Sequence, residues 1–336
     1  MDSNSSENQR VLREIPLDPT VAPQTVLLAD VDSTDTTFRI TTRTELDTLV
    51  LSIQKLGLMH PPVLKYNPPG YVIVCGFRRI AACRNLGWTK VPASVLKENF
   101  GSFELAQLAI ADNGLQRSLN LLETSRAMKL LADVCKDQKQ LKEASRDLGL
   151  PSNPSVAAKV EKICRLPLKI QDGILADTIN MSMALELDRL DPEVAEGLVR
   201  LFGQLKVGLN KQRELLLLLK EIAKRENISI PQLIAEKTLQ DILKNAELDR
   251  AVKRQKIRSY LRRRRFPSIS RAEEKYEKFV KQLKLGNNIK LIPPKDFEGM
   301  TYMMTFRFDN REELNNMKEI FEKIILHPSF DKILDR

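Results

Sequence analysis

The sequence predicts a multidomain α+β protein that is mostly helical. Strand-like apolar runs occur before Phe103 and again from Lys290 onward, whereas helical spacing of apolar residues dominates the stretch between them. Aromatic residues make up only 5% of the chain, while leucine, isoleucine and lysine are frequent, which favours helices. A length of 336 residues is enough for two or three domains.

Changes in these patterns divide the chain into five segments. We expect a flexible arm over residues 1–24 and a small mixed α/β domain over residues 25–120. An all-α domain with a helix-turn-helix is expected over residues 121–248, followed by a basic helix or linker over 249–289. Residues 290–336 are expected to form a small strand–helix module.

Charge, cysteine usage and hydropathy narrow the class of protein. A formal charge of +10 and an isoelectric point near 9.4 indicate a polyanionic partner. The four cysteines have no CxxC spacing and sit in apolar patterns, as reduced core residues do, and two histidines are too few for a His-rich metal site. The longest leucine run, Leu215–Leu219, is too short to cross a membrane, and the polar N-terminus lacks a signal-peptide pattern. We therefore expect a cytoplasmic protein with no membrane partner.

The first domain alternates short strands with two helices. A strand over residues 26–28 precedes a helix over 46–56, which Gly57 ends. Further strands are predicted over 63–66, 71–75 and 91–96, and the first two of these are joined by a turn over 67–70.

The stretch Tyr71–Trp88 contains the clearest candidate site. An apolar strand ends at Gly76, and a helix begins directly after it. Arg78 and Arg79 lie in the first turn of that helix, where the positive end of the helix dipole favours carboxylates instead. Backbone N–H groups together with guanidinium groups are what an anion site needs. The alternative is a strand–turn–helix with two solvated arginines, and the local pattern leaves both open.

Residues 140–165 have the form of a helix-turn-helix, after helices predicted over 103–112 and 123–135. We expect Ser155 to cap the second helix and Val156, Val160 and Ile163 to be buried. Lys159 and Lys162 then face outward with Ser155, on a small cationic face that fits a DNA major groove. An ordinary helical hairpin with two solvated lysines is the equally weighted alternative.

Residues 250–271 form the strongest charge feature, with ten Lys and Arg and no Asp or Glu. It follows short helices predicted from Pro167 to about Ala246, and it includes the run Arg262, Arg263, Arg264 and Arg265. A solvated helix normally mixes charges of both signs, so we interpret the tract as binding phosphates without sequence preference. The alternative is a basic linker.

The last segment is predicted to contain extended residues 290–294, a strand over 300–308 and an amphipathic helix over 311–326. A strand and one helix of this size cannot bury both of their apolar faces alone. The module either docks on the rest of the chain or pairs with a second copy, and we favour pairing because the basic tract before it has the form of a linker.

The order and spacing of these pieces, over about residues 26–190, resemble those of ParB-type proteins, the centromere-binding factors of bacterial partition systems. The matching motifs are Gly57-Leu58-Met59-His60-Pro61; Gly76-Phe77-Arg78-Arg79 with Ala81-Ala82 and Gly87; Val91-Pro92; Asp112-Asn113-Gly114-Leu115-Gln116-Arg117; and Leu166-Pro167 after the helix-turn-helix. The C-terminal third matches only in having a basic linker and a small terminal module.

The resemblance implies a clamp gated by CTP and a divalent metal, here Mg²⁺, which closes a homodimer around double-stranded DNA. It further implies a nucleoid-associated protein with a partition ATPase as partner. The nucleotide-binding residues carried over are Gly76, Arg78, Arg79, Asn113, Arg117 and Arg39. Asp112 and Asn113 would hold the metal, since a carboxylate and an amide oxygen suit Mg²⁺. The DNA-binding residues would be Asn153, Ser155, Lys159 and Lys162, with Arg262–Arg265 in the basic tract.

Several positions depart from the family pattern. Phe77 stands where the family has glutamate, and phenylalanine cannot position a hydrolytic water. The metal-box glutamate is Asp112, His60 replaces a glutamine, and of the proline–arginine loop only Arg39 is kept. We therefore expect a divergent member that is at most a weak CTPase. A transcription regulator with a vestigial nucleotide pocket and a nuclease or phosphotransferase of the same fold are the alternatives.

Overall fold

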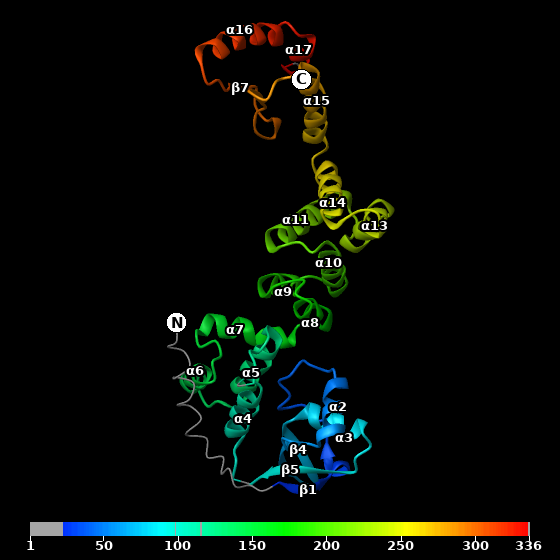
Figure 1. Cartoon of the computed structure of the whole chain (residues 1–336), viewed down its shortest axis with the longest axis vertical. Helices are drawn as coiled ribbons and strands as arrows, with labels where there is room; N and C mark the ends of the chain where they lie inside the picture. Colours follow the sequence, from blue (N-terminus) through cyan, green and yellow to red (C-terminus); the bar gives the residue numbers. More distant parts are fainter. Residues whose placement is uncertain (1–22, 98, 115, 335–336) are drawn as a thin grey trace. The chain divides into compact units, whose positions relative to one another are not determined.

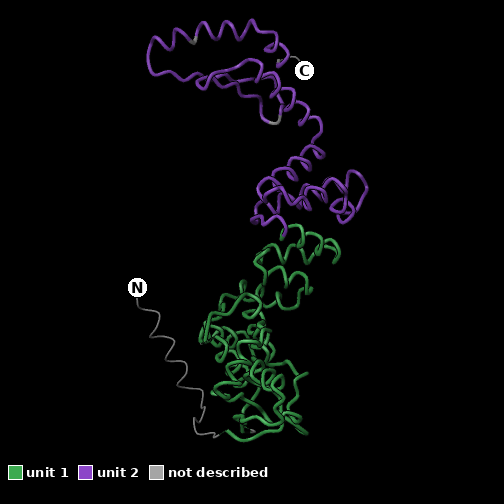
Figure 2. Tube along the Cα trace, turned by 45° about the vertical axis from the view of Figure 1, so that its right-hand side comes forward, with its two compact units in different colours: residues 1–203 green, residues 204–336 purple. Residues whose placement is uncertain are grey.

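The structure is a computed structural model that describes residues 23–97, 99–114 and 116–334. The described chain forms two compact units, one reaching to Gly203 and one starting at Gln204 (Figure 2). The predicted arm over residues 1–24 lies outside the described residues except for its last two. The five predicted segments divide the chain more finely than these two units, and that division stays a prediction.

A five-stranded mixed sheet forms the N-terminal part of the first unit (Figure 1). Its strands are β1 (Gln24–Leu27), β2 (Val31–Asp32), β3 (Val63–Asn67), β4 (Gly70–Cys75) and β5 (Lys90–Leu96), in the order β1-β5-β3-β4-β2. The hairpin β3–β4 and the pair β1–β5 are antiparallel, whereas β3–β5 and β2–β4 are parallel. The helices are η1 (Leu28–Asp30), α2 (Asp47–Leu56) and α3 (Phe77–Asn85). The predicted strands and helices of this region are confirmed.

The interior strand β4 is buried on both faces over its second half, which explains its unbroken apolar run. Ile73 packs with Ile53 of α2 and Ile80 of α3 on one face of the sheet. Val74 and Cys75 belong to a second core that continues into the helices that follow. The sheet therefore holds the start of α3 between two packed layers.

Seven α-helices follow among the described residues, and the last of them runs two residues past the end of the first unit. They are α4 (Ser102–Gly114), α5 (Leu121–Val134), α6 (Gln138–Asp147), α7 (Pro154–Lys162), α8 (Leu168–Leu175), α9 (Met181–Leu187) and α10 (Pro192–Leu205), with the short η2 (Ile163–Arg165) after α7. Helices α6 and α7 are the predicted helix-turn-helix, and Gly149 makes the turn with a φ of 69°. Both pack on α5 through Met128, Leu131, Ala144 and Val160.

Two details of the helix-turn-helix prediction are wrong. The cap of α7 is Asn153, not Ser155, because the Asn153 Oδ1 accepts hydrogen bonds from the backbone N–H groups of Ser155 at 3.0 Å and Val156 at 3.2 Å. Pro154 fills the first helical position, where its missing N–H group costs nothing. Val156, predicted to be buried, is 41% exposed because it lies in the first turn of α7, away from α5.

The second unit is helical before it ends in a small α/β module. Its elements are α11 (Leu209–Glu226), α12 (Ile230–Ala235), α13 (Lys237–Lys244), α14 (Arg250–Arg265), α15 (Pro267–Leu283), β6 (Ile289–Ile292), η3 (Lys295–Phe297), β7 (Met303–Phe306), α16 (Arg311–Ile325) and α17 (Pro328–Leu334). Helices α14 and α15 lie in the segment predicted as a basic helix or linker, whereas α17 was not expected. Among the described residues, no helix combines the length and the apolar character needed to cross a membrane.

The terminal module is larger than the sequence suggested. Strands β6 and β7 pair antiparallel, and Leu283 of α15 and Ile333 of α17 join Ile289, Leu291 and Ile324 in one small core. Much apolar surface still remains uncovered. Its most exposed members are Met300, Met303, Phe308, Leu314, Ile320, Phe321, Ile325 and Leu326.

Candidate functional site

A cleft of about 880 Å³ opens where the loop before α2, the start of α3 and the end of α4 meet. Four arginines, Arg43, Arg78, Arg79 and Arg117, line it together with His60, Thr41 and Asn113. Asp112 is the one carboxylate among the described residues that line this cleft. The cleft is therefore cationic, and residues far apart in the sequence build it.

The start of α3 gives the cleft backbone N–H groups. Gly76 caps the helix in a left-handed conformation with a φ of 93°, and no side chain caps the first turn. A Cβ at Gly76 would lie 2.9 Å from the Cβ of Pro62 and 3.0 Å from the Nε of Arg79. Both the backbone conformation and the space therefore require glycine, as the sequence indicated for a close approach to an anion.

Arg78 and Arg79 are held mainly by backbone oxygens. The Arg78 Nη2 donates to the Glu45 carbonyl at 2.5 Å, and its buried Nε has no hydrogen-bond partner. The Arg79 Nη1 donates to the carbonyls of His60 at 3.0 Å and Pro61 at 3.1 Å. Carbonyl oxygens orient a guanidinium without cancelling its charge, so Arg78 keeps its positive charge for a ligand. Arg79 has in addition one carboxylate partner, Asp112, at 3.4 Å.

The predicted metal ligands lie side by side in the last turn of α4. The carboxylate of Asp112 accepts from Arg79 at 3.4 Å and from the Gln116 side chain at 3.3 Å. The Asn113 amide nitrogen donates to the Ala109 carbonyl at 2.9 Å, which leaves the Asn113 amide oxygen free as an acceptor. One carboxylate and one amide oxygen fit Mg²⁺ that takes its remaining ligands from phosphates and water.

Arg117 reaches the cleft but is already paired. Its two terminal nitrogens each donate to one carboxylate oxygen of Glu123 at 2.6 Å, in a bidentate pair. The Glu123 side chain has no exposed surface, and burial opposes its charge. The hydrogen bonds from Arg117 and from the backbone N–H groups of Thr42 and Asn120 outweigh this, and they lower the pKa of Glu123 to about 2.

Sequence reasoning missed Glu123, although a signal was present. Asn120 and Glu123 form a capping box in which each side chain accepts a hydrogen bond from the other residue's backbone N–H. The Asn-x-x-Glu spacing before an apolar helix predicts this motif. The helix therefore begins at Leu121, two residues before the predicted start at Glu123.

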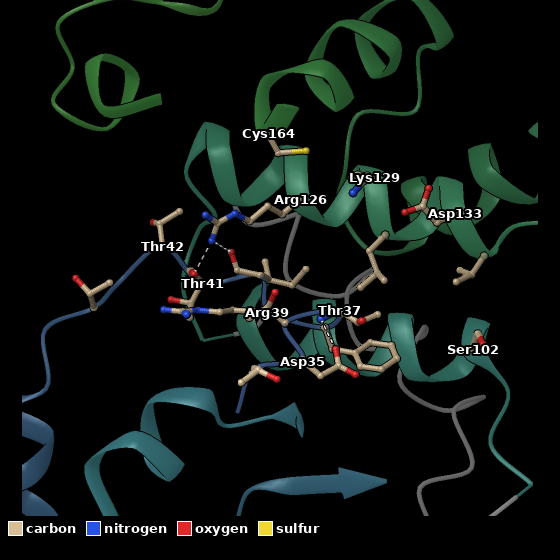
Figure 3. Close-up of a pocket in the computed structure, with 17 residues that line it drawn as sticks. Asp35, Thr37, Arg39, Thr41, Thr42, Ser102, Arg126, Lys129, Asp133 and Cys164 are labelled. Carbon is tan, nitrogen blue, oxygen red and sulfur yellow. Dashed lines mark hydrogen bonds between the residues drawn. The ribbon is translucent and has the colours of Figure 1, made fainter. Parts of the chain in front are cut away.

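Arg39 lies beside the cleft and is not part of its lining. It lines a neighbouring cavity of about 840 Å³ together with Arg126, and Figure 3 shows both side chains around Thr41. It also lines a third cavity of about 410 Å³ with Arg43, Phe77 and Arg78. Its nucleotide-binding role stays a prediction.

Phe77 and Cys75 bring no reactive group to the cleft. Phe77 is partly buried against both hydrophobic cores of the first unit. Burial and the charge of Asp112 raise the pKa of the Cys75 thiol, which lies 3.8 Å from the Leu108 carbonyl. A thiol in this environment stays protonated and behaves as a core residue.

The candidate DNA-binding face of α7 is exposed as predicted. Asn153, Ser155, Lys159 and Lys162 are all exposed. Within the described chain, no ion pair neutralises Lys159 or Lys162. Their role in DNA binding stays a prediction.

The arginine run of the basic tract has partners that its local sequence does not reveal. Arg262 pairs with Glu273 at 2.8 Å and Arg263 with Glu274 at 3.0 Å. Arg265 pairs with Glu221 at 2.6 Å, and Arg264 lies between Glu226 and Glu236. The premise that this tract is unneutralised is wrong, because these glutamates come from α11, α15 and the start of α13. Phosphate binding by the four arginines stays a prediction.

Comparison with protein families places the N-terminal part of the chain. The family model described as the ParB N-terminal domain matches residues 20–113, which include the sheet, Gly76–Arg79 and Asp112–Asn113. This chain carries a ParB N-terminal domain. The match stops before Arg117. The family model therefore does not cover α5 or the helices after it.

Curated relatives of this chain include nucleoid occlusion proteins. The protein of Bacillus cereus is 30% identical over 149 residues, which cover 44% of this chain and 49% of the relative. The protein of Bacillus cytotoxicus is 28% identical over 209 residues, or 59% of this chain and 69% of the relative. The chain thus spans about half the length of the first of these relatives.

Solved structures of ParB from Caulobacter crescentus are also similar. A truncated ParB with CTP-γ-S matches at 21% identity with a TM-score of 0.25, over 53% of this chain and 97% of that one. A truncated ParB bound to the centromeric parS site matches at 17% identity with a TM-score of 0.33, over 57% and 97%.

Proposed function

We propose that this protein is a nucleotide-gated DNA-binding protein that acts in partition or nucleoid occlusion. In this proposal the cleft of the ParB N-terminal domain binds CTP, and α7 of the helix-turn-helix binds double-stranded DNA. The protein is accordingly nucleoid-associated, and a partition ATPase is its expected partner in the cell.

The observation that carries this proposal is the start of α3. A helix start with no side-chain cap, a glycine in the left-handed conformation and two arginines meet at one wall of a nucleotide-sized cleft. This arrangement binds the phosphates of a nucleotide through N–H donors and fixed positive charge. The base preference for cytosine rests on the family alone.

Asp112 and Asn113 fit a magnesium ion at the same wall. In our proposal these two residues bind it through the Asp112 carboxylate and the free Asn113 amide oxygen. A bound Mg²⁺ would neutralise phosphate charge next to Arg79. Phe77 stands where the family has glutamate and cannot accept a proton from water, so we expect binding with little hydrolysis.

The second half of the proposal rests on α7. Its first turn is capped by Asn153 and exposes Ser155, and Lys159 and Lys162 follow on the same open face. Small and cationic side chains at the start of a helix fit the major groove, where bases and phosphates are both in reach. The uncovered apolar side chains of α16 further favour a homodimer through the terminal module.

Calorimetric titration of the full chain with CTP and with ATP, each with Mg²⁺, tests the nucleotide site. We expect CTP binding that Arg78→Ala weakens by at least tenfold, because a charge-assisted hydrogen bond contributes about 1.5–3 kcal/mol. Arg200→Ala is the matched control, since Arg200 is an arginine of the same unit that lies far outside the cleft lining and pairs with Glu196.

Heat from neither nucleotide would refute the gating proposal and leave the transcription-regulator alternative. Equal binding of CTP and ATP would keep the anion site but remove the base preference. Equal loss of affinity in Arg78→Ala and Arg200→Ala would show that the start of α3 is not the site.

A further inference from the structure

Helix α5 buries two polar side chains that an amphipathic helix would normally expose. Glu123 and Ser125 are both 0% exposed in a core that is otherwise apolar. Buried polar groups of this kind persist when each finds partners, so their partners show what they hold in place.

On one side, Glu123 joins two segments at the walls of the cleft. Besides Arg117, its carboxylate accepts hydrogen bonds from the Thr42 backbone N–H at 2.9 Å and the Thr42 hydroxyl at 3.1 Å. Thr42 lies between Thr41 and Arg43, which both line the cleft. A single buried carboxylate therefore fixes the loop at one wall and an arginine at another.

Two further side chains of the same region hold this loop. The Arg126 Nη1 donates to the Thr41 carbonyl at 2.8 Å and to the Ile40 carbonyl at 3.4 Å (Figure 3). The Asn120 side chain donates to the Thr42 hydroxyl at 2.8 Å. The loop thus moves only if α5 moves or if these bonds break.

On the other side, Ser125 joins α5 to the end of α7. Its hydroxyl donates to the Glu161 carbonyl at 3.1 Å and accepts from the Cys164 backbone N–H at 2.8 Å. Helix α5 therefore holds the cleft loop with Glu123 and holds the exposed helix α7 with Ser125, two residues further on.

We propose that α5 transmits the state of the cleft to α7, with Glu123 and Ser125 as the positioning residues at its two contacts. This inference rests on the proposed function for its ligand, but the mechanical link is a property of the chain itself. We call Thr42, Glu123, Ser125 and Arg126 the α5 relay.

Arg117 is the residue through which a bound ligand would change the contacts of Glu123. It is the cleft arginine with a full carboxylate partner, so a phosphate group in the cleft competes with Glu123 for its N–H groups. A buried carboxylate that loses its counter-charge is costly and must find other donors or move. Binding in the cleft would in this way shift Glu123, its helix, and the bonds that Ser125 makes to α7.

Hydrogen exchange on the full chain, with readout by peptide, tests the relay without any ligand. We expect Ser125→Ala to raise exchange about fivefold in residues 160–166, the fold-change of one lost hydrogen bond, and also in loop residues 39–43. Glu123→Gln should loosen the same two segments, since coupling between sites is reciprocal. Thr42→Val keeps the side-chain shape and removes the hydroxyl that bonds to Glu123. It tests the same coupling by a change in the loop instead of in α5.

Ser145→Ala is the matched control. Ser145 is a 1% exposed serine of α6 whose hydroxyl contacts only the Met128 sulfur, at 3.7 Å. We expect this variant to leave loop residues 39–43 unchanged. If Ser125→Ala loosens residues 160–166 alone, or if Ser145→Ala loosens the loop equally, the relay is wrong.

A second arm adds saturating CTP with Mg²⁺. In the wild type we expect protection of residues 39–43 and of 160–166, whereas in Glu123→Gln only the loop should be protected. Protection of both segments in Glu123→Gln would overturn the relay. No protection anywhere in the wild type would instead refute the proposed ligand, and the ligand-free arm would still decide the relay.

Discussion

The chain has two groups of arginines that look alike in sequence and differ in their partners. Arg78 and Arg79 at the start of α3 are held mostly by backbone carbonyls, and one buried nitrogen of Arg78 has no partner. The run Arg262–Arg265 at the end of α14 is matched by a glutamate for every arginine. A guanidinium bound to carbonyls offers its net charge to a ligand, whereas a carboxylate partner offsets much of the attraction that the charge exerts on an anion. Charge density along the sequence therefore does not identify an anion site.

Within the second group, Arg264 is a structural residue. It binds both Glu226 and Glu236, contacts the Tyr260 hydroxyl at 2.9 Å, and is only 22% exposed. Its hydrogen bonds, with those of Arg225, lower the pKa of Glu226 to about 2. These contacts fix the end of α14 against α11 and the segment that joins α12 to α13.

The largest effect is expected for Arg264→Ala, which leaves two carboxylates close together without their shared counter-ion. We expect this change to lower the stability of the second unit by about 2–3 kcal/mol, less than for a fully buried pair because both glutamates are partly exposed to solvent. Urea unfolding followed by hydrogen exchange of α11 and α14 measures the change.

The neighbouring Arg263→Ala is the control for that experiment. Arg263 is 66% exposed and pairs with a Glu274 that is 58% exposed, so its loss should cost below about 0.5 kcal/mol. Equal costs for the two variants would show that Arg264 is no more structural than its neighbour.

The cleft region of the first unit should respond to acid through Glu123, the partner of Arg117. Its folded pKa of about 2 lies below the ordinary value of 4.5, so its contribution is complete above pH 4.5 and is lost as the pH falls toward 2. We expect this single group to contribute about 2 kcal/mol less stability to the first unit at pH 3 than at pH 7. Glu123→Gln removes this titration.

Urea midpoints of the first unit at pH 7, 5, 4 and 3 provide the measurement. The stability difference between the wild type and Glu123→Gln should shrink as the pH falls. A constant difference over this range would contradict the assignment of a low pKa to Glu123.

The smallest effect is expected in the salt dependence of DNA binding. Neutralising Lys159 and Lys162 to glutamine should reduce the slope of log K against log salt by about 2, because each free lysine that contacts a phosphate contributes about 0.9. Neutralising Arg262 and Arg263 should change the slope by less than about 1, since both already have glutamate partners. Fluorescence anisotropy with one duplex from low to moderate salt measures both slopes. A larger change for the arginine pair would restore the basic tract as the main phosphate-binding surface.

The sequence alone predicted much of the fold and part of the site. Local signals were sufficient where a residue's role depends on its own backbone, as for Gly57 at the end of α2 and Gly76 before α3. Apolar spacing located β3, β4, β5 and most helices, because periodic burial is a local consequence of strand and helix geometry. Asn153 was predicted to contact DNA. In the structure its side chain caps the start of α7.

The terminal module has features that local sequence patterns do not predict. Helix α15 carries basic residues beside apolar ones, and its place in a core depends on Ile289 and Ile333, which come much later in the chain. The strand predicted over 300–308 is shorter in the structure: β7 ends at Phe306, and Phe308 beyond it is 48% exposed. The apolar surface of α16 was foreseen, since its spacing alone exceeds what one strand can cover.

The sequence by itself determined the strand–glycine–helix unit at Tyr71–Trp88, its two arginines and the helix-turn-helix that follows. Only the tertiary structure decided which charges are free. Arg117 is 6 residues from Glu123, but Arg264 is 38 residues from Glu226 and 28 from Glu236. The charge that an arginine offers a ligand depends on the groups within a few ångströms of it, and folding brings those groups from distant parts of the chain.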